Sequence, residues 1–335
     1  MTVLHHTWAI ILAGGDGSRL RALTTNESGV AVPKQFCSLR NGRSLLHEAL
    51  ARAQAVASPE HICVVVAAQH RRWWLPALAG VVNTNIIVQP ENRGTAIGIL
   101  LPLLHILARD PSARIVLLPS DHHVHDEPVL AAALQRGARE LYKGCTRVLL
   151  LGISPDDADP ELGYILPGPL RESGPSAVIQ FVEKPDPAEA RSLIEAGALW
   201  NAFIVMAKAD TLLQVFAKKF PQTVANMQKA VALDVEFPGR PDATAVLYQT
   251  LPHIDFSHHV LAGEESALGV LPVEHCGWSD LGTPQRVAQT LERFPASTGR
   301  FWGSSGIPAP GFLNLARQQA RMMARAGTDP QCRNF

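Results

Sequence analysis

A glycine-rich stretch near the start of the chain has the composition of an anion-binding loop. It follows residues 8–12, an apolar run rich in β-forming residues that predicts a buried strand. Glycines at the end of a strand allow a tight turn whose backbone N–H groups can face a ligand, and a triphosphate is a large anion that suits such a turn. The loop positions that we expect to bind it are Ala13, Gly14, Gly15, Gly17 and Ser18.

Two cations near this loop could neutralise phosphate charge. Arg19 lies inside the loop, and Lys34 follows in P-K-Q-F. Two well-known phosphate loops do not fit, because no lysine follows the last glycine and because Leu20 stands where the dinucleotide fingerprint needs its third glycine. The pattern therefore indicates another kind of phosphate loop, with an ordinary glycine-rich turn as the alternative.

Two aspartates far apart in the sequence could hold a hard cation. Asp121 follows a predicted strand in L-P-S-D-H, and Asp280 stands in G-W-S-D-L-G. Mg²⁺ takes one or two protein carboxylates together with phosphate oxygens, so a carboxylate at a strand end is well placed to bind it. The alternative for an isolated aspartate after a strand is a helix cap.

The histidines beside Asp121 raise the alternative of a transition-metal site. His122, His123 and His125 follow a strand closely, and successive side chains on extended backbone point to opposite sides. No cysteine or further histidine stands at ligand spacing, so we expect no zinc site here, and the same argument applies to His258 and His259.

The hydrophobic pattern alternates between strands and helices. This alternation predicts an α/β fold with a doubly wound, mainly parallel sheet and helices on both faces. Strands are expected at residues 8–12, 62–68, 85–88, 114–118, 147–152, 163–165, 177–182, 200–207 and 267–273. Helices are expected at residues 44–56, 71–78, 95–107, 127–142, 187–196, 208–220, 222–233 and 283–294.

Three polar motifs fall at the carboxyl ends of predicted strands. They are the glycine loop, Q-P-E-N-R-G-T and P-S-D. Because ligands of doubly wound sheets bind beyond this edge, the motifs predict one nucleotide site. Its further contacts are expected to be Gln89, Asn92, Thr95 and Ser120.

L-A-G-G-D-G-S-R-L followed by P-K-Q-F resembles the start of the sugar-1-phosphate nucleotidyltransferases, most closely the mannose-1-phosphate guanylyltransferases. The resemblance continues in order through P-E-N-R-G-T-A, P-S-D-H, E-K-P and G-W-S-D-L-G. It implies a Rossmann-like nucleotidyltransferase fold, an NTP with GTP favoured, a hexose 1-phosphate with mannose 1-phosphate favoured, and Mg²⁺ as cofactor. In this family the two aspartate motifs hold the metal, which implies Asp121 and Asp280 as its ligands.

The resemblance also implies where the sugar phosphate binds. In E-K-P, Lys184 would contact the sugar phosphate and Glu183 the sugar hydroxyls, with a solvated surface pair as the alternative. Gly163 would let backbone approach the sugar, and Asn201 would bond hydroxyls. The chain departs from the family where it reads W-N-A-F in place of W-N-[ST]-G, and R-A-L-T-T-N-E-S in place of L-W-P-x-S.

The implied reaction is attack by an oxygen of the sugar phosphate on the α-phosphorus of the NTP, in line with departing pyrophosphate. The catalytic residues would be Arg19, Lys34, Asp121 and Asp280, which offset charge on the triphosphate. Two alternatives remain: UTP or dTTP with glucose 1-phosphate, and a catalytically silent regulatory protein that binds nucleotide sugars.

Composition limits the expected partners. The formal net charge is zero, which argues against binding of nucleic acid or membrane through a broad basic field, and no apolar window is long enough for a transmembrane helix. Five scattered cysteines without a C-x-x-C pair suit a reducing cytoplasmic setting. A homo-oligomer is left open.

The expected domain division follows changes along the chain in the alternation of predicted strands and helices and in composition. We expect a catalytic domain at residues 1–295, with a nucleotide-binding part at 1–160 and a sugar-phosphate-binding part at 161–295. Residues 296–335 would form a C-terminal extension, with a helix at 312–326 and a flexible tail.

Overall fold

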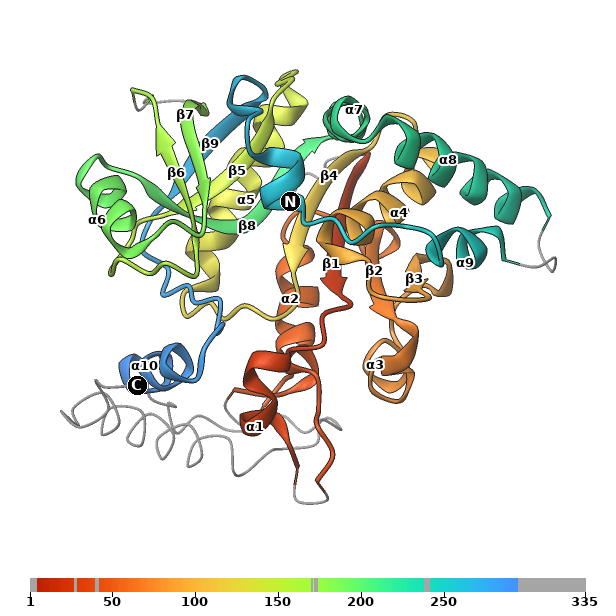
Figure 1. Ribbon diagram of the computed structural model, residues 1–335, viewed down its shortest axis with the longest axis horizontal. Coiled ribbons are helices and arrows are strands. Elements are labelled where there is room, and N and C mark those ends of the chain that lie inside the picture. The colour runs from red at the N-terminus through yellow and green to blue at the C-terminus, as the bar shows by residue number, and fades with distance from the viewer. Residues whose placement is uncertain are drawn as a thin grey trace, which may run out of the picture.

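One nine-stranded sheet with helices on both faces organises the molecule (Figure 1). The computed structural model describes residues 5–26, 29–39, 42–169, 171, 174–237 and 242–294. The strands are β1 Thr7–Ala13, β2 Ile62–Ala67, β3 Ile86–Gln89, β4 Arg114–Pro119, β5 Val148–Ile153, β6 Gly163–Pro167, β7 Ser176–Glu183, β8 Leu199–Lys208 and β9 Leu268–Val273. The α-helices are α1 Arg21–Thr24, α2 Leu45–Ala53, α3 Arg71–Ala77, α4 Gly94–Arg109, α5 Glu127–Tyr142, α6 Pro187–Glu195, α7 Ala209–Lys219, α8 Pro221–Glu236, α9 Ala243–Tyr248 and α10 Pro284–Arg293.

The strand order explains how the two halves of the chain meet. It runs β3-β2-β1-β4-β8-β5-β9-β7-β6. The first four strands pair in parallel, as do β5 and β9, whereas β8 lies antiparallel between β4 and β5. The α/β fold is therefore as expected, with a mixed sheet in which a strand from the second half of the chain occupies the centre. Strands from both expected parts of the catalytic domain thus share one sheet.

Two apolar layers cover the two faces of the sheet. Because side chains of a strand alternate between faces, Ile10 of β1 packs in the layer that contains α4, α7 and α8, while Ile11 packs in the layer that contains α2 and α5. Both side chains are fully buried. The near-continuous apolar runs of β1, β2 and β5 follow from this burial on both faces.

Polar residues at helix starts fix where several helices begin. The Ser44 side chain accepts a hydrogen bond from the backbone N–H of His47 and so caps the start of α2. Asp126 caps α5 and Thr283 caps α10 in the same way. These caps set the ends of the loops that lead to the site.

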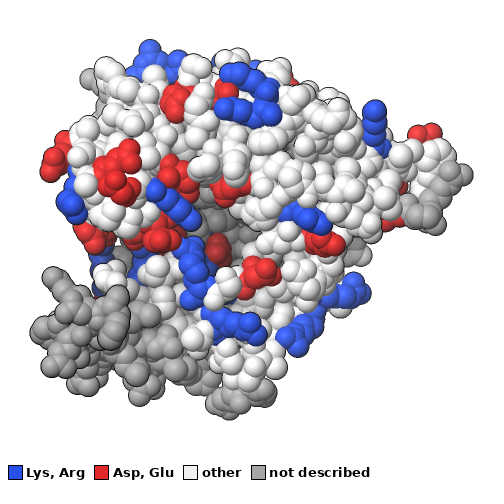
Figure 2. Space-filling model, viewed as in Figure 1, with Lys and Arg blue, Asp and Glu red and all other residues white. Residues whose placement is uncertain are grey.

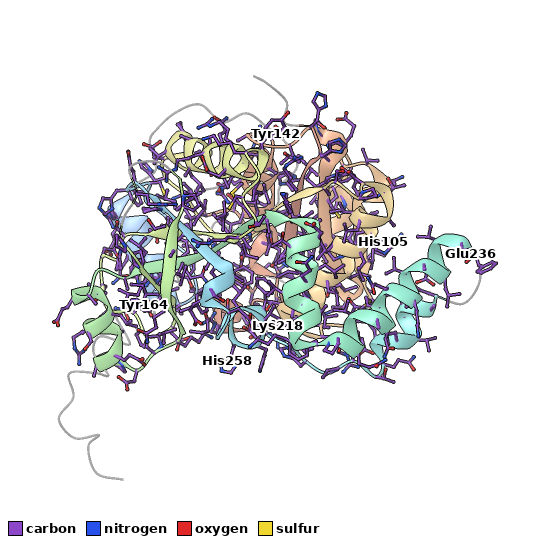
Figure 3. All side chains as sticks on the ribbon, turned by 90° about the horizontal axis from the view of Figure 1, so that it is seen from above. His105, Tyr142, Tyr164, Lys218, Glu236 and His258 are labelled. Carbon is purple, nitrogen blue, oxygen red and sulfur yellow. The ribbon has the colours of Figure 1, made fainter. Side chains whose placement is uncertain are left out.

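Some elements are not those that the sequence pattern predicts. The helix α9 and a π-helix at Phe256–Leu261 lie in a region where no element was expected. The helix expected at 312–326 and the tail lie outside the described residues. Helix α8 projects away from the sheet, and Glu236 at its end lies at the outer tip of the molecule (Figure 3).

The surface charge pattern agrees with the zero net charge of the sequence. On the face shown in Figure 2, the described lysines and arginines are interspersed with aspartates and glutamates, and they form no broad field of one sign. Among the described residues, no helix combines the length and apolarity that a membrane crossing needs.

Candidate functional site

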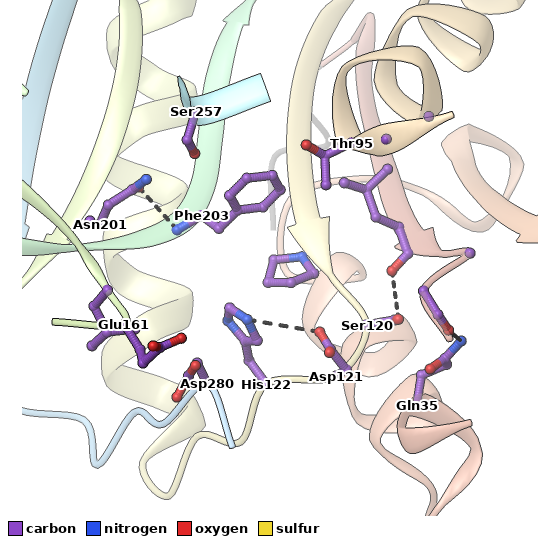
Figure 4. A pocket seen from close by; sticks show the side chains of 18 of the residues that line it. Gln35, Thr95, Ser120, Asp121, His122, Glu161, Asn201, Phe203, Ser257 and Asp280 are labelled. Carbon is purple, nitrogen blue, oxygen red and sulfur yellow. Dashed lines mark hydrogen bonds and ion pairs between the residues drawn. The ribbon is translucent and has the colours of Figure 1, made fainter. Parts of the chain in front are cut away.

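A pocket of about 320 Å³ lies beyond the carboxyl ends of β1, β3 and β4, where the polar motifs were expected to meet (Figure 4). Its N-terminal wall consists of the lining residues up to His122: Leu12, Gly14, Gly15, Arg19, Gln35, Gln89, Asn92, Gly94, Thr95, Gly98, Pro119, Ser120, Asp121 and His122. Its C-terminal wall consists of the lining residues from Glu161 onward: Glu161, Leu162, Gly163, Glu183, Lys184, Asn201, Phe203, Ser257, Trp278 and Asp280.

The glycine loop is braced from beneath by Gln35. Its amide nitrogen donates hydrogen bonds to the carbonyl oxygens of Ala13 and Gly15, both at 2.9 Å. Gly14 lies against the Gln89 side chain, and a Cβ on Gly14 would come within 2.6 Å of the Gln89 amide nitrogen. The loop therefore keeps its shape through buried amide side chains and leaves open space on the pocket side of Gly15.

Two hydroxyls expected to bind nucleotide already have protein partners. Ser120 Oγ donates to the carbonyl oxygen of Leu12 at 2.6 Å, which ties β4 to β1. Thr95 Oγ1 accepts from the backbone N–H of Phe256 at 2.7 Å and donates to Asp255 at 3.2 Å. Both residues line the pocket, but these contacts also give them a part in holding its walls in place.

Lys34 connects the two aspartates. It is only 6% exposed, and its Nζ lies 2.9 Å from Asp121 Oδ2. The same ammonium donates to the backbone carbonyl oxygens of Asp280, at 2.6 Å, and Leu281, at 3.3 Å. The expectation was a second cation beside the triphosphate loop, whereas the structure buries Lys34 behind the pocket surface. It fixes the strand that ends at Asp121 to the loop that carries Asp280.

The charge on Asp121 is stabilised in spite of its burial. Burial alone would raise the pKa of Asp121, but the positive charge of Lys34 and the hydrogen bond from its ammonium hold the pKa below its ordinary value. Burial lowers the pKa of His122 to about 4 even though Asp121 and Asp280 oppose the shift. At neutral pH the pocket thus presents an ionised carboxylate beside a neutral imidazole.

Asp280 is held by Arg286, a residue that the sequence pattern did not single out. Arg286 Nε lies 3.4 Å from Asp280 Oδ1, and the same guanidinium contacts Asp159 and stacks over the ring of Trp200 at 4.9 Å. Asp280 Oδ1 is nevertheless buried without a hydrogen-bond partner. A buried carboxylate oxygen left in this state is suited to a further cationic ligand.

The two carboxylates fit a divalent cation that also binds phosphate. Asp121 and Asp280 both line the pocket, and Asp280 offers an oxygen with unused bonding capacity. Among the described residues, no group of three or more histidine, cysteine, aspartate or glutamate side chains could hold a metal by itself. A cation with few protein ligands and several phosphate or water ligands, such as Mg²⁺, suits this donor set.

The neighbouring histidines face different pockets. His122 lines the pocket described here, whereas His123 and His125 line a second pocket beside α2 and α5. His125 also stacks on Phe294, with ring centroids 4.2 Å apart.

The C-terminal wall brings Gly163, Glu183, Lys184 and Asn201 together, as the sequence motifs predicted. Gly163 pairs with Glu183 across β6 and β7, and a Cβ on Gly163 would come within 2.6 Å of Glu183 Oε2. Burial and the negative charge of Asp255 raise the pKa of Glu183 to about 7, although Lys184 opposes the shift. The carboxyl group therefore lies close to the midpoint of its titration at neutral pH.

Two residues of the C-terminal wall have backbone conformations that favour glycine. Lys184 has φ 52° and Phe203 has φ 55°. Such values are uncommon for residues with a Cβ, and they cluster at functional sites in folded proteins. The Lys184 backbone N–H donates to the carbonyl oxygen of Leu162 at 3.2 Å, which holds its side chain at the pocket while it remains exposed.

Arg19 crosses from one wall to the other. Its guanidinium donates to Glu161 Oε2 at 3.0 Å, and the two side chains are 56% and 50% exposed. Glu27, an acidic residue near Arg19 in the sequence that could also pair with it, lies outside the described residues. A triphosphate bound at the glycine loop would compete with Glu161 for Arg19.

Most of the expected site residues line this pocket. Four expected residues do not line the pocket: Ala13, Gly17, Ser18 and Lys34. Ala13 is fully buried at the end of β1, and Gly17 packs against the Lys34 backbone, where a Cβ would lie 3.1 Å from its nitrogen. Ser18 begins a short 3₁₀ helix and is exposed. These four residues shape the loop rather than its pocket surface.

The sequence reasoning missed several lining residues. Some stood beside recognised motifs, so their position was a usable signal: Gln35, Gly94, His122, Glu161 and Trp278. Ser257 gave no such signal, because it lies in an unexpected π-helix. Phe203 stood in W-N-A-F, where the chain departs from the family pattern, but it was not named as a site residue.

Comparison with known proteins identifies the family. A family model described as nucleotidyl transferase matches residues 8–294, which include every residue that lines the pocket. The chain belongs to the nucleotidyl transferase family. The chain is 31% identical over 281 residues to the xanthan biosynthesis protein XanB of Xanthomonas campestris pv. campestris, with 82% of this chain and 57% of that protein covered.

Another relative is mannose-1-phosphate guanylyltransferase 2 of Escherichia coli O157:H7. It is 30% identical over 293 residues, with 83% of this chain and 58% of that protein covered. The chain therefore spans a little over half the length of these curated relatives.

Solved structures confirm the nucleotidyl transferase fold. A crystal structure titled mannose-1-phosphate geranyltransferase, from Thermus thermophilus, superposes with a TM-score of 0.72 at 23% identity, covering 95% of this chain and 99% of that one. A putative glucose-1-phosphate thymidylyltransferase from Bacillus anthracis gives a TM-score of 0.55 at 17% identity, covering 88% and 98%. The Rossmann-like fold expected from the motifs is thus confirmed.

Proposed function

We propose that this chain transfers a nucleotidyl group from an NTP to a hexose 1-phosphate, giving an NDP-hexose and pyrophosphate. An oxygen of the sugar phosphate forms a bond to the α-phosphorus while the bond between the α-phosphorus and the oxygen that bridges to the β-phosphate breaks. That bridging oxygen leaves with pyrophosphate. The electrons of the broken bond go with it, so no acid or nucleophilic side chain is required.

The contact of Lys34 with both aspartate segments carries this proposal. Its ammonium lies 2.9 Å from the Asp121 carboxylate and 2.6 Å from the Asp280 carbonyl oxygen. It therefore holds two carboxylates at one pocket between the glycine loop and the wall with Lys184. A site with acidic groups between two cationic regions suits two phosphorylated substrates that must approach each other.

The chain's own residues bind and orient both substrates in this proposal. The glycine loop and Arg19 contact the triphosphate, and the bidentate guanidinium offsets charge on the departing pyrophosphate. Lys184 holds the sugar phosphate, while Glu183 and Asn201 accept or donate hydrogen bonds to sugar hydroxyls. Asp121 and Asp280 would hold Mg²⁺. When bound, this cation supplies positive charge to the phosphates.

GTP and mannose 1-phosphate are the favoured substrates. Several relatives carry the name mannose-1-phosphate guanylyltransferase, and the P-K-Q-F and P-S-D-H motifs resemble that subgroup most closely. The departures at W-N-A-F and after Leu20 make other bases and sugars the alternatives to be tested.

A matrix of substrates tests the proposal directly. Pyrophosphate release is measured for GTP, UTP, dTTP, ATP and CTP against mannose 1-phosphate and glucose 1-phosphate, with Mg²⁺ present. The favoured pair should give the highest kcat/KM, and Asp280→Asn in the same preparation controls for contaminating activity. If no pair of NTP and sugar phosphate releases pyrophosphate and the protein binds a nucleotide sugar tightly, the proposed enzymatic activity is contradicted and a catalytically silent binding protein is supported.

A further inference from the structure

Phe203 lies at an irregularity in the central strand β8. Across the pair of β5 and β8, Leu150 lies opposite Val205 and Gly152 opposite Asn201. β8 thus advances four residues, from 201 to 205, where β5 advances two, from 150 to 152. The extra residues form a bulge around Phe203. Bulges near sites redirect a side chain that regular pairing would place elsewhere.

The backbone at this bulge is unfavourable for phenylalanine. Phe203 has φ 55°, a left-handed value that a large side chain seldom adopts. The Asn201 side-chain oxygen accepts a hydrogen bond from the Phe203 backbone N–H at 3.1 Å, which stabilises the turn. Glycine would adopt this conformation without steric cost, so the ring itself needs an explanation.

The Phe203 ring is fixed in position at the pocket. One side of it meets Phe256 edge to face, with centroids 6.2 Å apart and an interplanar angle of 80°. Phe256 is fully buried and packs on Phe216 at 5.5 Å, so it cannot move aside easily. Figure 4 shows the Phe203 ring pointing into the pocket between Asn201 and Thr95.

Polar and apolar features are divided within the C-terminal wall. Glu183, Lys184 and Asn201 provide groups for phosphate and hydroxyls, whereas Phe203 provides a flat apolar surface beside them. A pyranose has polar edges and faces made largely of C–H groups, so a site of this composition can bond the edges and contact one face. The ring also occupies volume that a glycine would leave open.

We propose that Phe203 determines which acceptor sugar this pocket accepts. Resting on the proposed function, this inference places the ring against a C–H face of a hexose 1-phosphate. The volume that the ring fills beside Asn201 then leaves no room for a bulky substituent at the adjoining edge of the sugar, such as an acetamido group. Phe203 is a specificity-determining residue in this view, and the phosphate contacts of Lys184 and Arg19 do not depend on it.

Calorimetry on the full chain tests the inference without requiring turnover. Binding of mannose 1-phosphate, glucose 1-phosphate and N-acetylglucosamine 1-phosphate is measured at a saturating, non-hydrolysable GTP analogue. The wild type should bind the better hexose phosphate at least about tenfold more tightly than the acetamido sugar, the scale expected for steric exclusion in a pocket. Phe203→Gly, which suits the left-handed backbone, should remove most of this difference and weaken the better hexose phosphate.

Phe203→Leu is the matched variant, because it keeps an apolar side chain against Phe256 and loses the flat ring. It should retain most of the exclusion of the acetamido sugar and weaken the hexose phosphates less than Phe203→Gly. Melting temperatures of the variants identify a folding defect, in which case Phe203→Leu and Phe203→Tyr decide the question. Phe203→Tyr should keep both the exclusion and the hexose binding.

The outcomes separate this inference from the proposed function. If wild type and Phe203→Gly show the same ratio of affinities for the hexose 1-phosphates and N-acetylglucosamine 1-phosphate, the role of Phe203 alone is overturned. A wild type that binds none of these sugar phosphates and releases no pyrophosphate would overturn the proposed function, and this inference with it.

Discussion

The two walls of the pocket present their ligand groups by different means. In the N-terminal wall the glycine loop offers backbone, and buried amide and hydroxyl groups such as those of Gln35 and Ser120 hold that backbone in place. The C-terminal wall offers charged and aromatic side chains, two of them on left-handed backbone, Lys184 and Phe203. Among the described residues, no non-glycine residue with positive φ lines the N-terminal wall.

This difference indicates how substitutions can affect each wall. A wall made of backbone tolerates few changes wherever an added side chain would meet the groups that support it, as at Gly14. A wall made of side chains can change its ligand by single substitutions, and unfavourable backbone at such positions is retained for the geometry that it provides. The following predictions test this comparison, from the largest expected effect to the smallest.

Loss of either carboxylate where the two walls meet should have the largest effect. Asp121→Asn and Asp280→Asn should each lower kcat about 1000-fold, because one charge that positions the cation and the phosphates is removed. Steady-state pyrophosphate release checks this. Near-wild-type turnover in either variant, or full activity in excess EDTA, would contradict the proposed metal site.

Arg19→Lys tests the single long cation of the N-terminal wall. The substitution keeps the charge but loses the bidentate guanidinium, so kcat should fall about 10- to 100-fold with a smaller change in KM. The exposed ion pair with Glu161 contributes little to stability, so the melting temperature should hardly change.

Glu161→Gln is the matched control for Arg19→Lys. It removes the same ion pair and leaves the guanidinium in place, so kcat should stay within about threefold of wild type. A lower melting temperature and unchanged kcat in Arg19→Lys would mean that Arg19 is a structural residue.

Lys184→Ala tests whether Lys184 in the C-terminal wall contacts the sugar phosphate and not the NTP. The KM for the sugar phosphate should rise about tenfold, since one charged contact to phosphate is lost. The affinity for NTP, measured by calorimetry without sugar, should change little. Lys184→Gly should lose the same contact while relieving the φ of 52°, so its melting temperature should exceed that of Lys184→Ala. A collapse of NTP affinity would assign Lys184 to the triphosphate.

Two neighbouring glycines test how tightly the N-terminal wall is packed. A Cβ on Gly14 would approach Gln89 to 2.6 Å, whereas a Cβ on Gly15 would meet nothing within 4 Å. Gly14→Ala should therefore lower the free energy of unfolding by about 1–2 kcal/mol, and Gly15→Ala by less than about 0.5 kcal/mol. Urea denaturation of the two variants measures both values, and equal losses would show that Gln89 yields freely.

Glu183→Gln should change the pH dependence of stability. The folded protein holds a proton on Glu183 up to a pKa of about 7, while the unfolded chain releases it near 4.5. Stability from this group is present below pH 4.5 and is lost as pH rises through 7. The free energy of unfolding should therefore fall less steeply between about pH 5 and 7 in Glu183→Gln than in wild type. Identical slopes would mean that the pKa is not raised.

The sequence predicts elements well where local pattern determines them. The helix expected at residues 127–142 is α5, residue for residue, because an apolar stripe and a capping aspartate define it locally. The position of β8 between β4 and β5 could not be predicted, because it depends on which distant strands pair. The bulge at Phe203 was not predicted either, because phenylalanine does not favour left-handed backbone, although the family pattern W-N-[ST]-G has a glycine at this position.

The motifs predicted the site better than its internal contacts. Asp121 and Asp280 were expected at one place and both line the pocket, because each stands in a recognisable motif. The contact of Lys34 with both segments was not foreseen, since a charged side chain in a sequence does not reveal whether it faces ligand or protein. Arg286 was missed for the same reason, although it lies beside Asp280.

The central place of β8 has a consequence for how the chain folds. Until residues 199–208 are available, β4 lacks its second neighbour and presents an open row of backbone donors and acceptors. Such an edge invites pairing with another chain, so a fragment that ends at residue 160 would be prone to aggregate. Closure of the sheet requires contacts between residues far apart in the chain, which favours slow folding during and after synthesis. The N-terminal wall of the pocket, which includes residues at the end of β4, therefore cannot be completed before β8, which carries part of the C-terminal wall, has been synthesised.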